Sequence, residues 1–443
     1  MALTLKTEKL AADGTAIAHT KDRTVYIPGA LEGETVLVDW TDRKKTHGHA
    51  RLFKVIEPSP LRIEAPCSYF KKGCGGCQWQ MASYENQLKF KADAIKETFS
   101  RIAHIKPDDL PLDPCIGMSD PWDYRNKAQY PLKRSPYGRL LTGYYQPGTH
   151  HIIDLNDCPV ESPMIKKALA AIKNLLETRR TPIYDEKEQK NGLRYLCLRA
   201  SERTGEILII LVSTHAIEPT LLESLRNLEI PGLKGIVENV NDAKTNVIYA
   251  KESRVLWGVP YYHEKISDKT LRVSALSFFQ INTAQTEAVV KDLLGNMPAT
   301  CENLLEGYSG IGTFSVFLSA RAKSVVSIED SFHSTSDAEA NNAANGAGNV
   351  RIIKKRVEDV IDDSLGAIDF CFFDPPRQGL HTKVITALIA KGPSAFAYLS
   401  CDPATLARDT KLLLAGGYQL KRLAPFDMFP HTHHVECLAY FSR

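Results

Sequence analysis

The sequence predicts a chain of the α/β and β classes, with a small N-terminal β-barrel, a central α+β domain and a C-terminal α/β domain. Three observations support this. Short alternating apolar stretches separated by glycine and proline fill the N-terminal part, basic and aromatic strand segments follow, and from about Val273 strands alternate with helices. A length of 443 residues suits about three domains. We expect them at residues 1–58, 59–265 and 266–443.

The composition is that of an ordinary soluble globular protein, with 43% hydrophobic and 24% charged residues. We expect a cytoplasmic location, because the sequence shows no membrane span or export signal and is rich in cysteine. No apolar run reaches the roughly 18 residues that span a membrane, and the N-terminus lacks the apolar core of a signal peptide. Ten cysteines without an export signal indicate a reducing compartment, where clustered cysteines bind metals or catalyse reactions. A net charge of +3 permits a nucleic-acid partner without requiring one.

The N-terminal segment predicts a barrel because its alternating stretches are separated by Gly14, Pro28–Gly29 and Gly33. The expected strand segments are Leu3–Lys6, Ala16–Ala18, Thr24–Ile27, Thr35–Trp40 and Ala50–Ile56. Small barrels of this kind often bind oligonucleotides on one face, and Arg43–His49 forms a basic loop. A solvated loop on a folding accessory fits the composition equally well.

Three cysteines close together, Cys67, Cys74 and Cys77, predict a metal site with Cys158 as the fourth ligand. Four thiolates hold either zinc or an iron–sulfur cluster. Zinc ribbons usually pair two C-x-x-C knuckles, whereas this sequence has one such knuckle, so a [4Fe–4S] cluster is favoured over zinc. The other scattered cysteines are expected to be packing residues: Cys115, Cys197, Cys301, Cys371 and Cys437.

An amphipathic helix is expected over 83–102, with Leu88, Ala92, Ile95 and Phe99 at helical spacing, and it should pack on the C-terminal domain.

The segment Tyr124–Arg134 interleaves basic and aromatic residues, and strand patterns follow at Arg194–Arg199 and Ile207–Val212. Such a surface suits single-stranded or looped RNA, because aromatic rings stack on bases and cations contact phosphates. The same interleaving also occurs on plain sheet surfaces. The central domain is therefore interpreted as an RNA-binding α+β domain that carries the metal cluster.

A glycine turn in Asn303–Ser315 follows a predicted strand and opens a helix, and a second strand ends in Glu329. Such a turn brings backbone close to a nucleotide, and the acid can bind ribose hydroxyls. This pattern predicts a Rossmann-like domain. A single G-x-G favours S-adenosylmethionine over a dinucleotide. The strand Ala367–Asp374 ends in a carboxylate at the edge where such sheets bind ligands.

Cys401 is placed where the apolar segment Ala395–Leu399 ends and a helical pattern begins. Backbone N–H groups and the helix dipole at such a junction favour a thiolate, which is a good nucleophile. A lone cysteine is more often a packing residue, but Asp374–Arg377 and Glu436 also carry candidate catalytic groups. The sequence therefore indicates a nucleophilic cysteine.

Together these segments resemble the RNA uracil-5-methyltransferase family, whose members make 5-methyluridine in ribosomal and transfer RNA. The matching motifs are Phe278–Asn282, Tyr308–Gly312, Asp374–Gly379, Ser400–Thr405 and His434–Glu436. The N-terminal barrel resembles a TRAM domain, which is OB-like, and Cys67, Cys74, Cys77 and Cys158 match the cluster cysteines of the ribosomal-RNA branch.

The resemblance implies S-adenosylmethionine-dependent methylation of carbon 5 of uridine in RNA, an RNA (uracil-5-)-methyltransferase activity (EC 2.1.1.-). It implies that Cys401 adds to carbon 6 and that Glu436 removes the carbon-5 proton. The residues implied in cofactor binding are Gln280, Tyr308, Thr313, Glu329 and Asp374. Leu305–Ser309 departs from the Asp-Leu-aromatic-Cys run common in the family, although Glu306 keeps an acid.

Several points stay open. Arg377 either contacts phosphate or braces Asp374, and at least two of His431, His433 and His434 are expected to be solvated or structural.

The barrel and cluster together favour 23S ribosomal RNA as substrate, with transfer RNA as the alternative, and we expect a monomer. The cysteine spacing does not fit the C-x3-C-x2-C triad of radical enzymes, and cytosine-5 methylation uses a different motif order. A non-catalytic RNA-binding factor is expected to have lost Cys401 or Glu436, and both are present.

Overall fold

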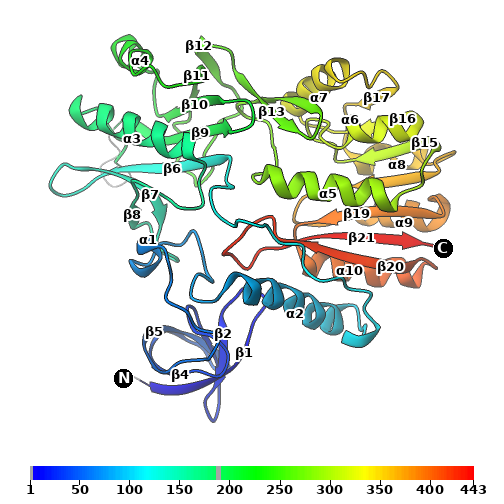
Figure 1. Ribbon diagram of the computed structural model, residues 1–443, viewed down its shortest axis with the longest axis horizontal. Coiled ribbons are helices and arrows are strands. Elements are labelled where there is room, and N and C mark those ends of the chain that lie inside the picture. Colours follow the sequence, from blue (N-terminus) through cyan, green and yellow to red (C-terminus); the bar gives the residue numbers. More distant parts are fainter. Residues whose placement is uncertain (1–2, 186–190) are drawn as a thin grey trace. The chain divides into compact units, whose positions relative to one another are not determined.

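The computed structural model describes residues 3–185 and 191–443. The chain divides into two compact units, which are described separately (Figure 1). The first comprises Met1–Lys71, Gly76–Pro121 and Phe372–Arg443, and the second comprises Lys72–Gly75 and Trp122–Cys371. No helix in the described ranges is long and apolar enough to cross a membrane.

The first unit begins with a closed five-stranded barrel, in the order β1-β2-β3-β5-β4. Its strands are β1 (Leu3–Leu10), β2 (Ala16–His19), β3 (Thr24–Ile27), β4 (Thr35–Arg43) and β5 (His47–Glu57). Every second residue points inward, as strand geometry requires, so that Ala16, Ala18, Val25, Ile27 and Val36 are fully buried. The predicted N-terminal barrel is confirmed.

The remainder of the first unit packs helices on an antiparallel sheet in which β21 lies between β19 and β20. Its elements are α1 (Ser68–Lys71), α2 (Tyr84–Ile102), a 3-10 turn (Pro107–Asp109), α9 (Thr382–Lys391), β19 (Ala395–Ser400), α10 (Pro403–Ala415), β20 (Gln419–Phe426) and β21 (Glu436–Ser442). The helix expected over 83–102 is α2, which Ser83 caps by accepting a hydrogen bond from the N–H of Asn86. Helix α2 packs against α10.

The second unit contains a seven-stranded sheet in the order β12-β11-β10-β9-β6-β7-β8 (Figure 1). Its strands are β6 (Lys127–Arg134), β7 (Leu140–Tyr145), β8 (Ile152–Asp154), β9 (Leu193–Ser201), β10 (Glu206–Ser213), β11 (Leu233–Val240) and β12 (Arg254–Gly258). The helices α3 (Pro163–Thr178) and α4 (Pro219–Arg226) contribute to the same core, in which Ile172, Leu198 and Ile209 are fully buried.

The rest of the second unit contains the hairpin β13 (Tyr261–Ile266)–β14 (Lys269–Ser274) and the parallel strands β17, β16 and β15, adjacent in that order. Its other elements are α5 (Thr283–Asn296), β15 (Cys301–Gly307), α6 (Ser315–Leu318), a 3-10 turn (Ser319–Arg321), β16 (Ala322–Ile328), α7 (Phe332–Ala344), β17 (Val350–Ile353) and α8 (Val357–Ser364). The chain passes from the second unit to the first within β18 (Phe370–Phe373). This alternation confirms the predicted α/β pattern.

Helix α7 is tied to the hairpin by Asp337, whose carboxylate is fully buried. It accepts hydrogen bonds from Arg272 Nε at 2.8 Å and from the Ser277 hydroxyl at 2.7 Å. A buried carboxylate is stable only when hydrogen-bond donors satisfy it. The bonds to Asp337 therefore hold the segment that precedes Gln280 in place.

Candidate active site

The sheet register brings Cys401 and Glu436 to neighbouring positions. Ser400 of β19 pairs with Cys437 of β21, and in this antiparallel ladder the next residues along are Cys401 and Glu436. Directly opposed residues of antiparallel strands have Cα atoms about 4.5–5.5 Å apart. Glu436 is also paired with Phe426 of β20, which holds its backbone on that side. The two predicted catalytic residues are therefore brought together.

The thiol of Cys401 is half-buried and is not poised as a thiolate in the RNA-free protein. Burial and the carboxyl groups of Glu436 and Asp374 raise the pKa of Cys401 to about 12, against the opposing effect of Arg377. Backbone N–H groups and the helix dipole are expected to favour a thiolate here, but burial and the two carboxyl groups outweigh them. Asp402 caps α10 and accepts hydrogen bonds from the N–H groups of Ala404 at 2.8 Å and Thr405 at 3.0 Å.

Glu436 is almost fully buried, at 3% exposure. Among the residues that the structure describes, none donates a hydrogen bond to its Oε2 atom, which is buried. Burial, followed by the Asp374 carboxyl group, raises the pKa of Glu436 to about 8, although Arg377 opposes this. A carboxyl group with a pKa close to neutral is suited to general acid–base chemistry.

Asp374 and Arg377 lie on the loop after β18 and act electrostatically on both Cys401 and Glu436. Arg377 is exposed, and no described residue accepts a hydrogen bond from its guanidinium group. The buried carboxylate of Asp409 anchors this loop from α10 by accepting a hydrogen bond from Leu380 N–H at 2.9 Å. A Cβ atom at Gly379, whose φ is +77°, would lie 2.5 Å from Asp409 Oδ2, so the loop requires glycine there.

The three histidines before Glu436 differ in their surroundings. His431 is buried, its N–H donates to Gln87 Oε1 at 3.1 Å, and its carbonyl accepts from Trp79 N–H at 3.0 Å, so it is structural as expected. Burial lowers the pKa of His431 and of His434 to about 4, and burial also lowers that of His433. The rings of His433 and His434 lie 4.1 Å apart between centroids. These histidines are neutral at pH 7.

The predicted cofactor turn follows β15 in the second unit. Tyr308 has a φ of +62°, while Gly310 and Gly312 have φ values of +55° and +77°. Glu329, directly after β16, accepts hydrogen bonds from the N–H groups of Gly310 at 2.9 Å and Ser331 at 2.8 Å. Burial raises the pKa of Glu329 despite these bonds. The predicted ribose-binding acid is thus attached to the glycine turn.

Two other predicted cofactor residues belong to the same unit as the turn: Thr313 follows it in sequence, and Gln280 precedes α5. Thr313 and Gln280 are nearly buried, and the carbonyl of Gln280 accepts a hydrogen bond from Asn126 Nδ2 at 3.0 Å. Glu306 is buried in β15 and accepts a hydrogen bond from the hydroxyl of Ser315, at the start of α6. The acid kept at Glu306 therefore holds the start of α6, which follows the turn.

The four cysteines predicted to bind a metal do not form a recognisable site. Within residues 3–185 and 191–443, no group of three or more His, Cys, Asp or Glu side chains is arranged to hold a metal ion. Cys67 and Cys158 are buried, while Cys74 and Cys77 are half-buried. Cys67 and Cys77 belong to the first unit and Cys74 and Cys158 to the second, so the four-cysteine site remains a prediction from the sequence.

The aromatic residues of the predicted RNA-binding segment are turned inward. Tyr130 is fully buried, and its hydroxyl donates to the buried carboxylate of Glu161, as does the hydroxyl of Tyr144. Burial raises the pKa of Glu161. Tyr124 is also buried, so these two rings do not contribute to the basic and aromatic surface that the segment predicts.

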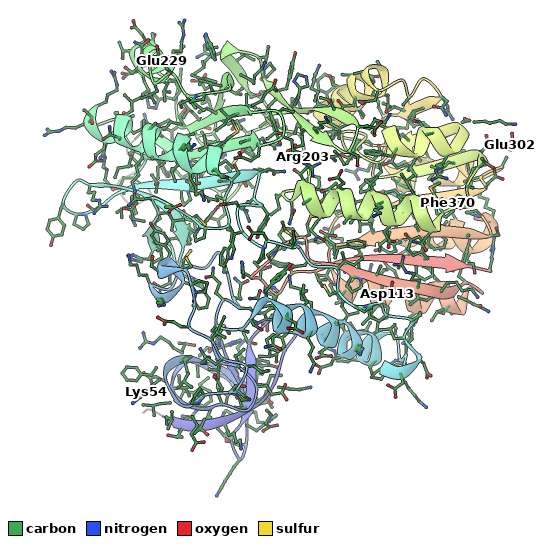
Figure 2. All side chains as sticks on the ribbon, viewed as in Figure 1. Lys54, Asp113, Arg203, Glu229, Glu302 and Phe370 are labelled. Carbon is green, nitrogen blue, oxygen red and sulfur yellow. The ribbon has the colours of Figure 1, made fainter. Side chains whose placement is uncertain are left out.

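Exposed groups suited to RNA occur elsewhere. Tyr145 is 37% exposed and stacks on His150, with centroids 5.5 Å apart. On the barrel, Lys54 lies on the outer surface (Figure 2), beside Phe53, which is 73% exposed.

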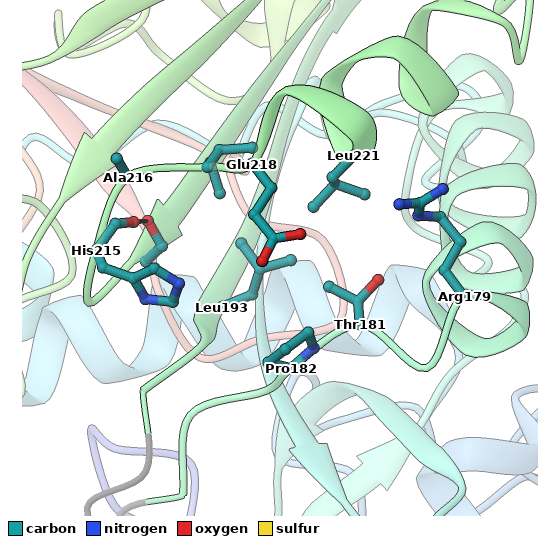
Figure 3. Close-up of a pocket in the computed structure, with 10 residues that line it drawn as sticks. Arg179, Thr181, Pro182, Leu193, His215, Ala216, Glu218 and Leu221 are labelled. Carbon is teal, nitrogen blue, oxygen red and sulfur yellow. Dashed lines mark hydrogen bonds between the residues drawn. The ribbon is translucent and has the colours of Figure 1, made fainter.

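A small pocket of about 80 Å³ is present in the second unit (Figure 3). Arg179, Thr181 and Glu218 lie around it, and no described residue forms a hydrogen bond with the Thr181 hydroxyl, which is buried. None of the predicted site residues lines this pocket.

Sequence reasoning missed the buried Lys91 of α2. It forms an ion pair with Asp427, and both side chains are fully buried. Its signal was present, because Gln87 and Lys91 continue the helical row of Ile95 and Phe99 on the buried face. A lysine on the apolar face of a helix therefore indicates a buried acidic partner.

The parallel strands, the glycine turn closed by Glu329 and the thiol–carboxyl pair together match the class of α/β methyltransferases. A family model described as tRNA (Uracil-5-)-methyltransferase matches residues 83–443. The chain therefore belongs to the tRNA (uracil-5-)-methyltransferase family, and it is an enzyme of the RNA methyltransferase class.

Individual relatives agree with this assignment. The chain is 37% identical to an uncharacterized RNA methyltransferase of Halalkalibacterium halodurans, over 98% of this chain and 95% of the relative. It is 36% identical to an uncharacterized RNA methyltransferase of Thermosynechococcus vestitus, over 99% and 97% of the two chains. The crystal structure of Pyrococcus abyssi tRNA (uracil-54, C5)-methyltransferase in complex with S-adenosyl-L-homocysteine matches with a TM-score of 0.79 and 25% identity, covering 99% of each chain.

Proposed function

We propose that this protein transfers a methyl group from S-adenosylmethionine to carbon 5 of a uridine in RNA, through a covalent adduct between Cys401 and carbon 6. The observation that carries the proposal is that Cys401 and Glu436 lie one step beyond the last pair of the β19–β21 ladder, where the Glu436 carboxyl acts electrostatically on the Cys401 thiol. A nucleophile and a general base side by side suit a reaction in which one group adds to the ring and the other removes a proton from the adjacent carbon.

Carbon 5 of uracil is a poor nucleophile until sulfur bonds to carbon 6. In the first step the Cys401 thiol loses its proton to solvent, and its sulfur bonds to carbon 6 to leave an enolate. S-adenosylmethionine, when bound, supplies an electrophilic methyl group that carbon 5 takes as the S–CH3 bond breaks. Glu436 then removes the carbon-5 proton, the C6–S bond breaks, and the thiolate leaves as the C5=C6 bond forms again.

The raised pKa of Cys401, to about 12, gives Arg377 a role in this scheme. Arg377 lowers the pKa of Cys401 and is exposed, so it is available to the thiolate and to a phosphate of the RNA alike. Burial and, after it, the Asp374 carboxyl act in the opposite sense and raise the pKa of both Cys401 and Glu436.

The residues around the glycine turn fit S-adenosylmethionine. A Cβ atom at Gly310 would meet no atom within 4 Å, so the turn borders open space, and Glu329 beside it retains lone pairs for two ribose hydroxyls. Tyr308 and Thr313 flank the same turn, and we assign them, with Gln280 and Asp374, to cofactor binding.

We propose 23S ribosomal RNA as the substrate because Cys67, Cys74, Cys77 and Cys158 resemble the cluster cysteines of the ribosomal-RNA branch. The barrel does not decide between the two substrates, since the Pyrococcus abyssi tRNA enzyme matches 99% of this chain, barrel included. Transfer RNA is the second candidate, because the Pyrococcus abyssi neighbour is a tRNA (uracil-54, C5)-methyltransferase. The target base has to leave its stack to reach Cys401, so a loop or single-stranded region is favoured.

The test uses 23S ribosomal RNA and, separately, transfer RNA, each transcribed with 5-fluorouridine and incubated with the protein and S-adenosylmethionine. Fluorine cannot leave carbon 5 as a proton does, so the adduct is trapped and can be mapped by mass spectrometry. An adduct that joins Cys401 to one uridine of 23S RNA is expected. An adduct with transfer RNA alone would keep the reaction and change the substrate, and no adduct with either would refute the proposed function.

A further inference from the structure

Lys91 of α2 contacts the segment 427–435, which connects β20 to β21 and ends at Glu436. Its ammonium group forms an ion pair with Asp427. It also donates to the carbonyl oxygens of Phe429 at 3.1 Å and His434 at 2.7 Å. An ammonium group has three donors, so all are used on one segment, at its start, middle and end.

Two further residues of α2 bind the same segment. The Tyr84 hydroxyl donates to Asp427 Oδ2 at 2.7 Å, and Gln87 accepts a hydrogen bond from His431 N–H at 3.1 Å. His431 has a φ of +68°, which a non-glycine residue adopts only where its surroundings hold it. One face of α2 therefore determines the path of the chain immediately before Glu436.

Glu436 depends on this path for its orientation. Within the described part of the chain its buried Oε2 atom has no hydrogen-bond donor, so backbone placement and packing orient the carboxyl group. Lys91 acts on this backbone two residues away, at His434. The charged groups that shift the pKa of Glu436 are Asp374 and Arg377, so Lys91 does not act as its counter-charge.

We propose, resting on the proposed function, that Lys91 is a positioning residue that holds the β20–β21 segment so that Glu436 can remove the carbon-5 proton. Burying a lysine–aspartate pair has a desolvation cost that apolar side chains would avoid. The three directed bonds from the Lys91 ammonium group explain why a lysine is present here. The step affected is elimination, whereas attack by Cys401 and methyl transfer precede it.

The test separates these steps. On RNA that contains 5-fluorouridine the reaction stops before elimination, so adduct formation does not need the base. When the same RNA contains uridine instead, turnover requires the base. The Lys91→Met variant is measured on both, with the RNA that the wild-type protein labels, either 23S or transfer RNA. Lys89→Met is the matched control, because Lys89 is exposed on the same helix.

We expect Lys91→Met to form the 5-fluorouridine adduct within about twofold of the wild-type rate, while uridine turnover falls roughly 10- to 100-fold, as small misplacements of catalytic groups do. A denaturation-resistant protein–RNA complex should then accumulate on uridine RNA, and Lys89→Met should behave as wild type. If Lys91→Met is unfolded in thermal melts, Lys91→Met/Asp427→Asn removes the unpaired buried charge and replaces it in the assay. Equal slowing of both reactions, or no change in either, would overturn the role of Lys91. Failure of the wild-type protein to form any adduct would instead count against the proposed function.

Discussion

Cys401 and Glu436 lie one step beyond the last residue pair of the β19–β21 ladder, Ser400 and Cys437. The register of two antiparallel strands thus places a thiol beside a carboxyl group, although 35 positions separate them in the sequence. Burial raises the pKa of both groups, the Glu436 carboxyl adds to the effect on Cys401, and the Asp374 carboxyl adds to it at both.

Replacing Cys401 by serine should abolish the adduct with 5-fluorouridine RNA and lower methylation by more than about 10³-fold, because a hydroxyl is a far weaker nucleophile. Transfer of tritium-labelled methyl groups and denaturing gels measure both effects. Cys301→Ser, at the start of β15, is the control and should leave the rate unchanged. Retained adduct formation in Cys401→Ser would show that another residue is the nucleophile.

Replacing Glu436 by glutamine should trap the reaction after methyl transfer. Sulfur addition still occurs, but the carbon-5 proton stays, so a covalent complex of protein with methylated RNA accumulates on ordinary uridine RNA. Gel shift under denaturing conditions and mass spectrometry of the nucleotide attached to Cys401 measure it. Normal release of 5-methyluridine by this variant would exclude Glu436 as the base.

The pH dependence of the elimination step should follow the ionisation of Glu436. The ratio of uridine turnover to 5-fluorouridine adduct formation isolates the elimination step. It should rise with pH and level off above about 8, the pKa of Glu436. A ratio that is constant between about pH 6 and 9 would contradict this assignment.

Stability should change with pH in the opposite direction. The folded pKa of Glu436, about 8, lies above its usual value of 4.5, so between these values the folded state binds a proton that the unfolded state has lost. The stability that protonated Glu436 contributes to the folded state is therefore fully present below about pH 4.5, and it is lost as pH rises through about 8. Melting temperatures should fall across this window, and Glu436→Gln should flatten the fall.

Replacing Glu329 by glutamine should weaken binding of S-adenosylmethionine by roughly 10- to 100-fold, the effect expected from losing charged hydrogen bonds to ribose hydroxyls. Isothermal titration calorimetry without RNA measures it. Asp330→Asn is the matched control, since Asp330 is the exposed neighbour of Glu329. Unchanged affinity in Glu329→Gln would remove this residue from the cofactor site.

The cysteine prediction is tested by metal content. Protein purified without oxygen should contain about four iron and four sulfide per chain if a [4Fe–4S] cluster is present. Cys74→Ser should lose them while Cys301→Ser keeps them. Stoichiometric zinc would change the metal, and protein free of both metals would show that the four cysteines are not ligands.

The sequence by itself determined the local elements and their chemistry. Alternating residues such as Ala16 and Ala18 predicted the barrel, and the glycine turn with Glu329 predicted a nucleotide-type site. Cys401 was also placed correctly between a strand and a helix. These features depend on residue spacing within one or two neighbouring elements, which period and turn chemistry reveal directly.

The tertiary structure alone decided which distant groups act on one another. Burial and the nearby carboxyl groups of Glu436 and Asp374 raise the pKa of Cys401, where the sequence favoured a thiolate. In the predicted RNA-binding segment, Tyr130 is buried and bonded to Glu161. The tie from Lys91 to the segment before Glu436 also joins residues far apart in sequence. Burial and electrostatic interaction depend on distances through space, and the pattern of a single element does not contain them.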